Sequence, residues 1–157
     1  MPLFARRSAR ADAPAAVPRL REVDEREAEW IAAHVALVAD AGVDIDDSGQ
    51  LRAHYDRAAV AWRRINPPER DDPRLTVNAI GMAFGEHLVR RTPLRWMLAE
   101  DDEGTELALH DPRSRVLVYP ALLVTEQWTA EAPGDFLTAT IEQVTAKLPD
   151  PRRGRRA

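Results

Sequence analysis

The spacing of apolar residues changes twice along this chain of 157 residues, and that change limits the fold more than any other feature. Apolar side chains recur at helical intervals up to residue 91, alternate or run together as in strands from residue 94 to 119, and return to helical intervals after residue 135. Helices followed by strands and a last helix are typical of an α+β domain. We therefore expect helices first, then a three- or four-stranded antiparallel sheet, then a C-terminal helix packed on the sheet.

Two helices are expected in the first part of the chain. Asp24 and Glu27 form a capping-box pattern at the start of the first helix, and Gly42 follows its last turn. The second helix begins near Asp47 and ends before the prolines of residues 66–68, because the residue before a proline leaves the helical conformation. We expect these two helices to form an antiparallel pair.

A third helix is expected from Asp72, with a proline at its first position, to Arg91. It contains two glycines, Gly81 and Gly85, each of which costs about 1 kcal/mol relative to alanine inside a helix. We therefore expect the sheet to pack closely against the backbone of this helix at these positions.

Strands and a last helix complete the expected fold. The strands are predicted at residues 94–98, 105–110 and 116–119, and the apolar residues 122–124 continue the third strand or begin a fourth. The last helix is predicted at residues 135–148, where apolar residues recur on one face.

The two ends of the chain differ from the rest in composition. Residues 1–22 and 149–157 are predicted to be disordered basic tails around a single α+β domain at 23–148. Five arginines and one aspartate precede residue 22, and four arginines and one aspartate follow residue 148, which leaves a net charge of −11 on the part between them. Such an acidic surface attracts basic partners and argues against nucleic-acid binding by the folded part.

Several classes of function are disfavoured by what the sequence lacks. There is no cysteine for a disulfide, a thiol nucleophile or a zinc site, and no two histidines have metal-ligand spacing, so no metal or cofactor is expected. No apolar run is long enough to span a bilayer, and no apolar signal segment follows the first arginines, so we expect a cytoplasmic protein. The strong preference for arginine over lysine is typical of a GC-rich bacterial genome.

One stretch of the chain resembles a known family. Gly81-Met82-Ala83-Phe84-Gly85-Glu86 leads into Leu94-Arg95-Trp96, and an acidic turn with Gly104 and an apolar strand ending in Pro120 follow. This order resembles the bacterial family of uncharacterised domains named DUF3806, over residues 66–148. The resemblance implies a fold but no established activity.

Glu86 is a candidate general acid or base, with Asp101 or Glu106 as its companion where the third helix meets the sheet. The alternative, which we favour, is structural: Glu86 accepts hydrogen bonds from the sheet backbone or pairs with an arginine such as Arg95. The three serines do not stand in a nucleophile motif.

A second set of residues is expected to bind a partner. The acidic run at residues 100–103 is predicted to be a solvated hairpin tip that a basic partner can contact. Trp96 is expected to face the interior, whereas Trp128 follows a polar stretch and is either partly exposed or, in our preferred interpretation, packed in the core or as a lid over it. The binding candidates are Glu86, Trp96, Asp102, Glu103 and Trp128.

The sequence therefore favours a non-enzymatic, accessory or immunity-like domain that binds a basic protein partner through an acidic surface. Two alternatives stay open. One is a small hydrolase or isomerase that uses Glu86 and nearby carboxylates, and the other is a small-ligand sensor in the cleft between helix and sheet.

Overall fold

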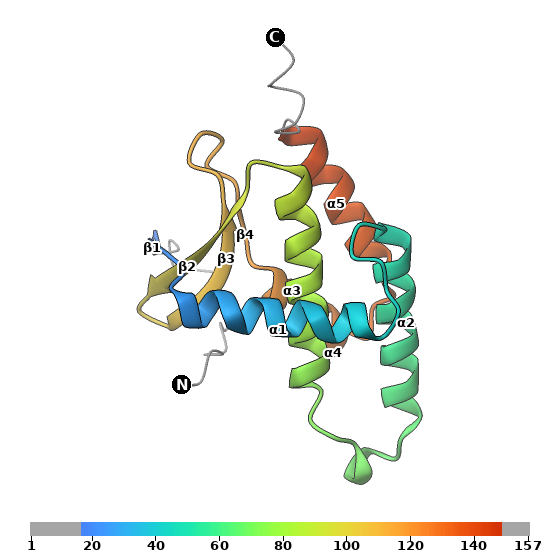
Figure 1. Ribbon diagram of the computed structural model, residues 1–157. Helices are drawn as coiled ribbons and strands as arrows, with labels where there is room; N and C mark the ends of the chain where they lie inside the picture. Colours follow the sequence, from blue (N-terminus) through green and yellow to red (C-terminus); the bar gives the residue numbers. More distant parts are fainter. Residues whose placement is uncertain (1–16, 149–157) are drawn as a thin grey trace.

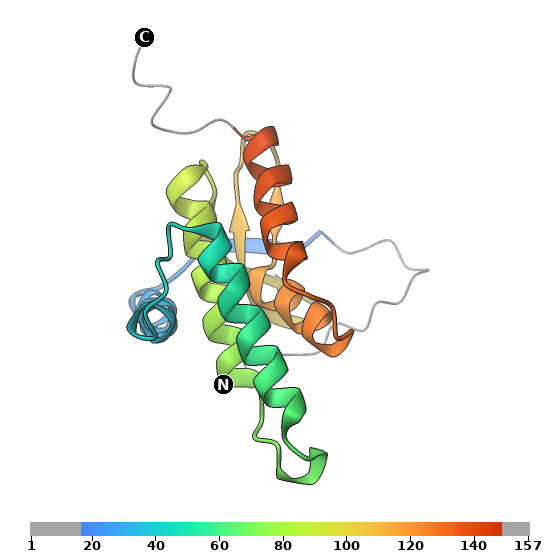
Figure 2. The same ribbon diagram turned by 90° about the vertical axis from the view of Figure 1, so that its right-hand side faces the viewer.

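The computed structural model describes residues 17–148 and has the α+β class expected from the sequence (Figures 1 and 2). Within these residues the chain forms a four-stranded antiparallel sheet and five α-helices. The strands are β1 (Arg19–Glu22), β2 (Arg95–Asp101), β3 (Gly104–His110) and β4 (Leu117–Val118). The helices are α1 (Glu25–Asp40), α2 (Ser48–Arg64), α3 (Arg74–Arg91), α4 (Pro120–Thr129) and α5 (Asp135–Lys147), with a short 3-10 helix, η1 (Pro67–Glu69), before α3.

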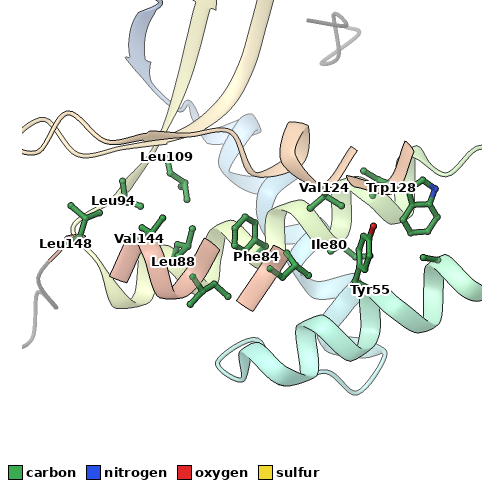
Figure 3. Close-up of a cluster of buried hydrophobic side chains, with 14 residues drawn as sticks. Tyr55, Ile80, Phe84, Leu88, Leu94, Leu109, Val124, Trp128, Val144 and Leu148 are labelled. Atoms are coloured by element: carbon green, nitrogen blue, oxygen red, sulfur yellow. The ribbon is translucent and has the colours of Figure 1, made fainter. Parts of the chain in front are cut away.

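Helix α3 lies at the centre of the molecule and contacts each of the other four α-helices. Figure 2 shows α1 on one side of α3 and both α4 and α5 on the other. Every residue of α3 from 77 to 85 is buried, which a helix with neighbours all round requires. The main core cluster joins α3 to α2, α4, α5 and the sheet, and its members include Tyr55, Phe84, Leu109, Val124 and Val144 (Figure 3).

The sheet has the strand order β1-β2-β3-β4, and one of its faces packs on the helices. Leu98 of β2 lies opposite Leu107 of β3, and both leucines pack against Ile31 of α1 and Met82 of α3. Because side chains two residues apart along a strand project from the same face of a sheet, Trp96, two residues before Leu98, also projects toward the helices.

The two glycines of α3 mark its closest contacts. A Cβ atom on Gly81 would lie 2.7 Å from Cα of Ala121 in α4, and one on Gly85 would lie 2.6 Å from Cζ2 of Trp96 in β2. The expected approach of the sheet is therefore confirmed at Gly85, but at Gly81 the close neighbour is a helix.

The expected order of elements is wrong at its beginning, because a strand precedes the helices. Strand β1 lies at residues 19–22, inside the stretch predicted to be disordered, and pairs with β2 from Arg19–Glu100 to Glu22–Met97. Its four residues, Arg-Leu-Arg-Glu, show little apolar character, so its pairing depends on the neighbouring strand. The remaining predicted tail residues, 1–16 and 149–157, lie outside the described residues.

Residues 122–124 were expected to continue the third strand or to begin a fourth, and both alternatives are wrong. These residues belong to α4, which begins at Pro120. A proline at the first helical position loses no hydrogen bond, so Pro120 starts a helix here. A short apolar run does not by itself distinguish a buried strand from a buried helix.

The first two helices do not form the expected antiparallel pair. Helix α1 crosses α3, whereas α2 packs against α3 and α5 (Figure 1). The end of α1, the connector and the start of α2 meet on α3, where Val38, Val43, Ile45 and Leu51 pack with Ala79 and Ala83. The central helix thus replaces the direct contact between α1 and α2.

Candidate functional site

A groove of about 350 Å³ lies between α1, α3 and the beginning of β2. Helix α1 supplies most of its apolar wall, together with Val23, which joins β1 to α1. Helix α3 and strand β2 supply the polar end. The lining residues are Val23, Ala28, Ile31, Ala32, Val35, Ala36, Glu86, Arg90 and Trp96.

The apolar wall follows from the sequence of α1. Ala28, Ala32 and Ala36 are four residues apart, so they share one face of the helix, and all three are exposed. Their small side chains leave the space of the groove open to solvent. Ile31 and Val35 border this strip toward α3 and the sheet, where Ile31 is buried.

The start of α1 is fixed by the predicted capping box. The backbone N–H of Glu27 donates to Oδ1 of Asp24 at 2.8 Å, and the backbone N–H of Asp24 donates to Oε1 of Glu27 at 2.8 Å. Arg21 of β1 donates to both oxygens of Glu27, at 2.8 and 2.9 Å, and these bonds lower the pKa of Glu27. The wall of the groove is therefore attached to the sheet edge at its first turn.

The polar end of the groove is built around Glu86. Trp96 donates its indole N–H to Oε2 of Glu86 at 3.2 Å, and Arg90, one helical turn further along α3, donates Nε–H to Oε1 at 3.4 Å. About a quarter of the Glu86 side chain is exposed. The favoured structural interpretation, an arginine partner, is thus correct in kind, but the partner is Arg90; Arg95 pairs with Glu22 instead.

The end of α3 holds the connector between α1 and α2 beside the groove. Nδ1 of His87 lies 2.7 Å from the carbonyl oxygen of Ile45, which can only accept, so the ring donates this bond. Burial lowers the pKa of His87. Asp46 accepts from Arg90 and Arg91, and these bonds, against the opposing effect of burial, hold the pKa of Asp46 below its usual value.

Most of the excess negative charge lies in two segments, one that includes α1, the wall of the groove, and one that is the β2–β3 hairpin. Residues 22–47 contain nine acidic side chains and one arginine, and residues 100–106 contain five acidic side chains and no basic one. Arg21, which pairs with Glu27 of α1, also lies 3.5 Å from Glu100 of β2, so it joins the two segments. We call these two segments the acidic side.

The catalytic candidates are not brought together. Asp101 pairs with Gly104, and Glu106 with Ala99, so both project from the sheet face opposite to that of Trp96. Asp101 is also five residues from Trp96 along β2, roughly 17 Å away. Glu86, which contacts Trp96, is therefore separated from both carboxylates.

The binding candidates divide into three places. Glu86 and Trp96 meet in the groove, and Trp96 is half-buried there. Asp102 and Glu103 form the exposed hairpin tip between β2 and β3, as expected. Trp128 is only 5% exposed and packs in the main core, which is the preferred of its two interpretations.

Sequence reasoning missed Arg90 and the wall of α1 as parts of a site. The signal for the wall was the repeat of alanines at positions 28, 32 and 36, which lies beside the more obvious stripe of larger apolar residues. For Arg90 the signal was its position four residues after Glu86.

Within residues 17–148 no three acidic, histidine or cysteine side chains form a cluster that could hold a metal ion. In the same part of the chain, no helix has the length and apolar character needed to cross a membrane.

The fold and the groove define a small α+β domain with a ligand- or partner-sized groove between two helices and a sheet. The chain belongs to the family described as "Domain of unknown function (DUF3806)", whose model matches residues 56–139. Comparison with curated proteins and with solved structures gives no significant match. The matched residues include Glu86, Arg90 and Trp96, whereas α1, the apolar wall, lies outside them.

Proposed function

We propose that this domain is a non-enzymatic binding module that docks a basic protein partner on its acidic side. The observation that carries the proposal is the acidity of two segments: residues 22–47 and 100–106 together hold fourteen acidic side chains and one arginine. Within residues 17–148, four arginines of other segments pair with four of these fourteen, namely Glu22, Glu27, Asp46 and Glu100. Complementary charge of this kind mainly sets the rate of association and the choice of partner.

Two features of the groove favour binding over catalysis. The carboxylate of Glu86 accepts hydrogen bonds from Trp96 and Arg90, and neither of the other candidate carboxylates faces it. The nearest histidine along α3, His87, is buried and donates to the carbonyl of Ile45. The hydrolase or isomerase considered from the sequence needs Asp101 or Glu106 beside Glu86, and this arrangement does not bring either of them there.

The test is a pull-down with the full chain as bait, from a lysate of the organism that encodes it. The pull-down is carried out at two salt concentrations, about 0.1 M and about 1 M. The Debye length falls from about 10 Å to about 3 Å between them. We expect a stoichiometric partner that is lost at high salt. We also expect the partner to be lost at low salt when Glu25, Glu29, Asp102 and Glu103 are changed to their amides.

The control removes charge from another part of the surface. Glu126→Gln with Glu142→Gln changes exposed residues of α4 and α5 and should leave capture unchanged. A partner that binds the amide variant as well as the native chain, or no partner at all, contradicts the proposal.

A small-ligand sensor is the second candidate, favoured by the volume of the groove. About 350 Å³ lies at the lower end of the range for small-molecule sites, and the groove combines apolar walls with a few polar groups. A metabolite that raises the melting temperature of the native chain but not that of Glu86→Gln would support it.

A further inference from the structure

The shape of the groove suits a helix. The exposed alanines of α1 span nine residues, so the wall is about 12 Å long, a little more than two helical turns. Rows of residues four apart form the ridges and grooves through which helices pack, and small residues in such a row allow close approach. An extended peptide finds few backbone partners here, because β2 is paired with β3 along its whole length and with β1 over residues 97–100, which leaves Arg95 and Trp96 at its beginning without a partner strand on that side.

Negative charge on α1 lies along one edge of the groove, and the hairpin beyond the first turn of α1 extends it. Glu25 and Glu29 are exposed on α1, one turn before Ala28 and Ala32 along the helix. The hairpin of residues 100–106 adds five acidic side chains, joined to α1 by Arg21. A second copy of this chain would bring like charges together, whereas a segment with lysine or arginine at its edges pairs with them.

Glu86 provides a specific contact inside the groove. Its two hydrogen bonds, at 3.2 and 3.4 Å, are long, and a carboxylate accepts about four. The exposed quarter of its side chain faces a groove that is otherwise mostly apolar. A lysine or arginine of the bound segment that reaches Glu86 would therefore find a partly desolvated acceptor, where a charge-assisted bond is stronger than at the surface.

These observations lead to one partner class. We infer that the groove between α1, α3 and β2 binds an amphipathic helical segment of a partner protein, with small or apolar side chains along one face and lysine or arginine at its edges. This inference rests on the proposed function, since it names the place and the kind of segment through which the basic partner docks.

The experiment uses the full chain and two labelled synthetic peptides of about 18 residues, long enough to form a helix. One peptide has leucine and alanine at helical spacing on one face and lysine elsewhere. The other has the same composition in an order that destroys the apolar face. Fluorescence anisotropy measures both dissociation constants at about 0.1 M salt. We expect the patterned peptide to bind at least about tenfold more tightly than the scrambled one.

Matched variants of α1 separate the groove from the rest of the helix. Ala32→Gln with Ala36→Gln fills the groove, whereas Ala33→Gln with Ala39→Gln changes exposed residues that do not line it. Glutamine is a good helix former, so both pairs keep α1 folded. The first pair should weaken binding of the patterned peptide about tenfold, and the second pair less than about twofold. Glu86→Gln should also weaken it, with the thermal stability of the free chain unchanged.

Each other outcome overturns a defined part of this interpretation. If both peptides bind equally and the groove variant has no effect, while Glu25→Gln with Glu29→Gln weakens both, the groove inference is wrong and the acidic docking side remains. If neither peptide binds, the groove inference and the acidic docking proposal are both wrong. Self-association of the native chain that Ala32→Gln with Ala36→Gln abolishes would identify a second copy as the occupant and overturn the inference.

Discussion

Gly81 and Gly85 are the residues on which the packing around α3 depends most directly. A helix gains stability when an interior glycine is replaced by alanine, unless the new methyl group meets another atom. At Gly81 that atom belongs to the backbone of Ala121, at 2.7 Å, and at Gly85 the ring of Trp96 fills the space. A backbone in a packed helix moves less easily than a half-buried side chain.

We predict that Gly81→Ala lowers the free energy of unfolding by about 1–3 kcal/mol, because α4 must move away from α3. Gly85→Leu should cost more than about 2 kcal/mol, because it displaces Trp96 from the groove. Urea denaturation measures both. Gly49→Ala in α2 is the control, since the Cβ would meet only a side-chain oxygen of Asp47, at 3.2 Å, and it should be neutral or stabilising. An unchanged Gly81→Ala midpoint would show that α3 and α4 separate at little cost.

At the scale of residues, contacts between side chains one helical turn apart are predictable from the sequence, whereas contacts between distant elements are not. The partnership of Asp24 and Glu27 is visible in the sequence because both residues lie in one helical turn. Glu86 was expected to pair with an arginine, and the choice of Arg90 follows from the same local rule. The bond from Trp96 to Glu86 is not predictable in this way, because it depends on where β2 meets α3.

At the scale of elements, one histidine joins α3 to the connector between α1 and α2. His87 is buried and donates to the carbonyl of Ile45, beside the ion pairs of Asp46 with Arg90 and Arg91. Burial, together with the two arginines, lowers the pKa of His87, so the neutral ring is the form that the folded protein holds. The anchoring of the connector therefore depends on pH.

We predict that the protein loses stability as the pH falls from about 7.5 to about 5. A group with a lowered pKa in the folded state contributes its full stability above its unfolded pKa, about 6.5 for histidine, and that contribution declines as the pH falls toward the folded value. His54, whose pKa burial also lowers, acts in the same direction. Denaturation midpoints across this range should depend less on pH in His87→Gln, and least in His54→Gln with His87→Gln. An unchanged slope in the double variant contradicts the prediction.

The elements that were predicted correctly are those whose own sequence shows a regular spacing of apolar residues or a helix cap. Helices α1, α2, α3 and α5 and strands β2 and β3 carry their apolar pattern or their caps in the sequence. Strand β1 carries neither and exists because it pairs with β2. Residues 122–124 carry an apolar run without a period, and the proline before them allows a helix as well as a strand.

At the scale of the whole molecule, charge is distributed unevenly. Residues 17–148 hold 24 acidic and 15 basic side chains, and most of the excess lies in residues 22–47 and 100–106. The total charge was readable from the sequence, but the contact between its two acidic segments was not. It depends on β1, which joins the hairpin to α1 through Arg21 and was not expected as a strand.

This distribution should make the free protein more stable in salt. Like charges on the acidic side repel one another, and added ions screen that repulsion. We predict a higher melting temperature at about 0.5 M sodium chloride than at about 0.1 M, measured by circular dichroism. Asp102→Asn with Glu103→Gln should raise the melting temperature at low salt and reduce the gain from salt.

The same charge removed elsewhere is the control for that experiment. Glu126→Gln with Glu142→Gln takes two charges from α4 and α5, outside the acidic side, and should change the salt response less. A melting temperature that falls with salt would mean that attractive pairs, such as Arg21 with Glu27, outweigh the repulsion. In that case a basic partner would relieve no repulsion when it binds. A melting temperature that rises with salt means that repulsion within the acidic side destabilises the free domain. On our proposal this is also the surface that binds the basic partner.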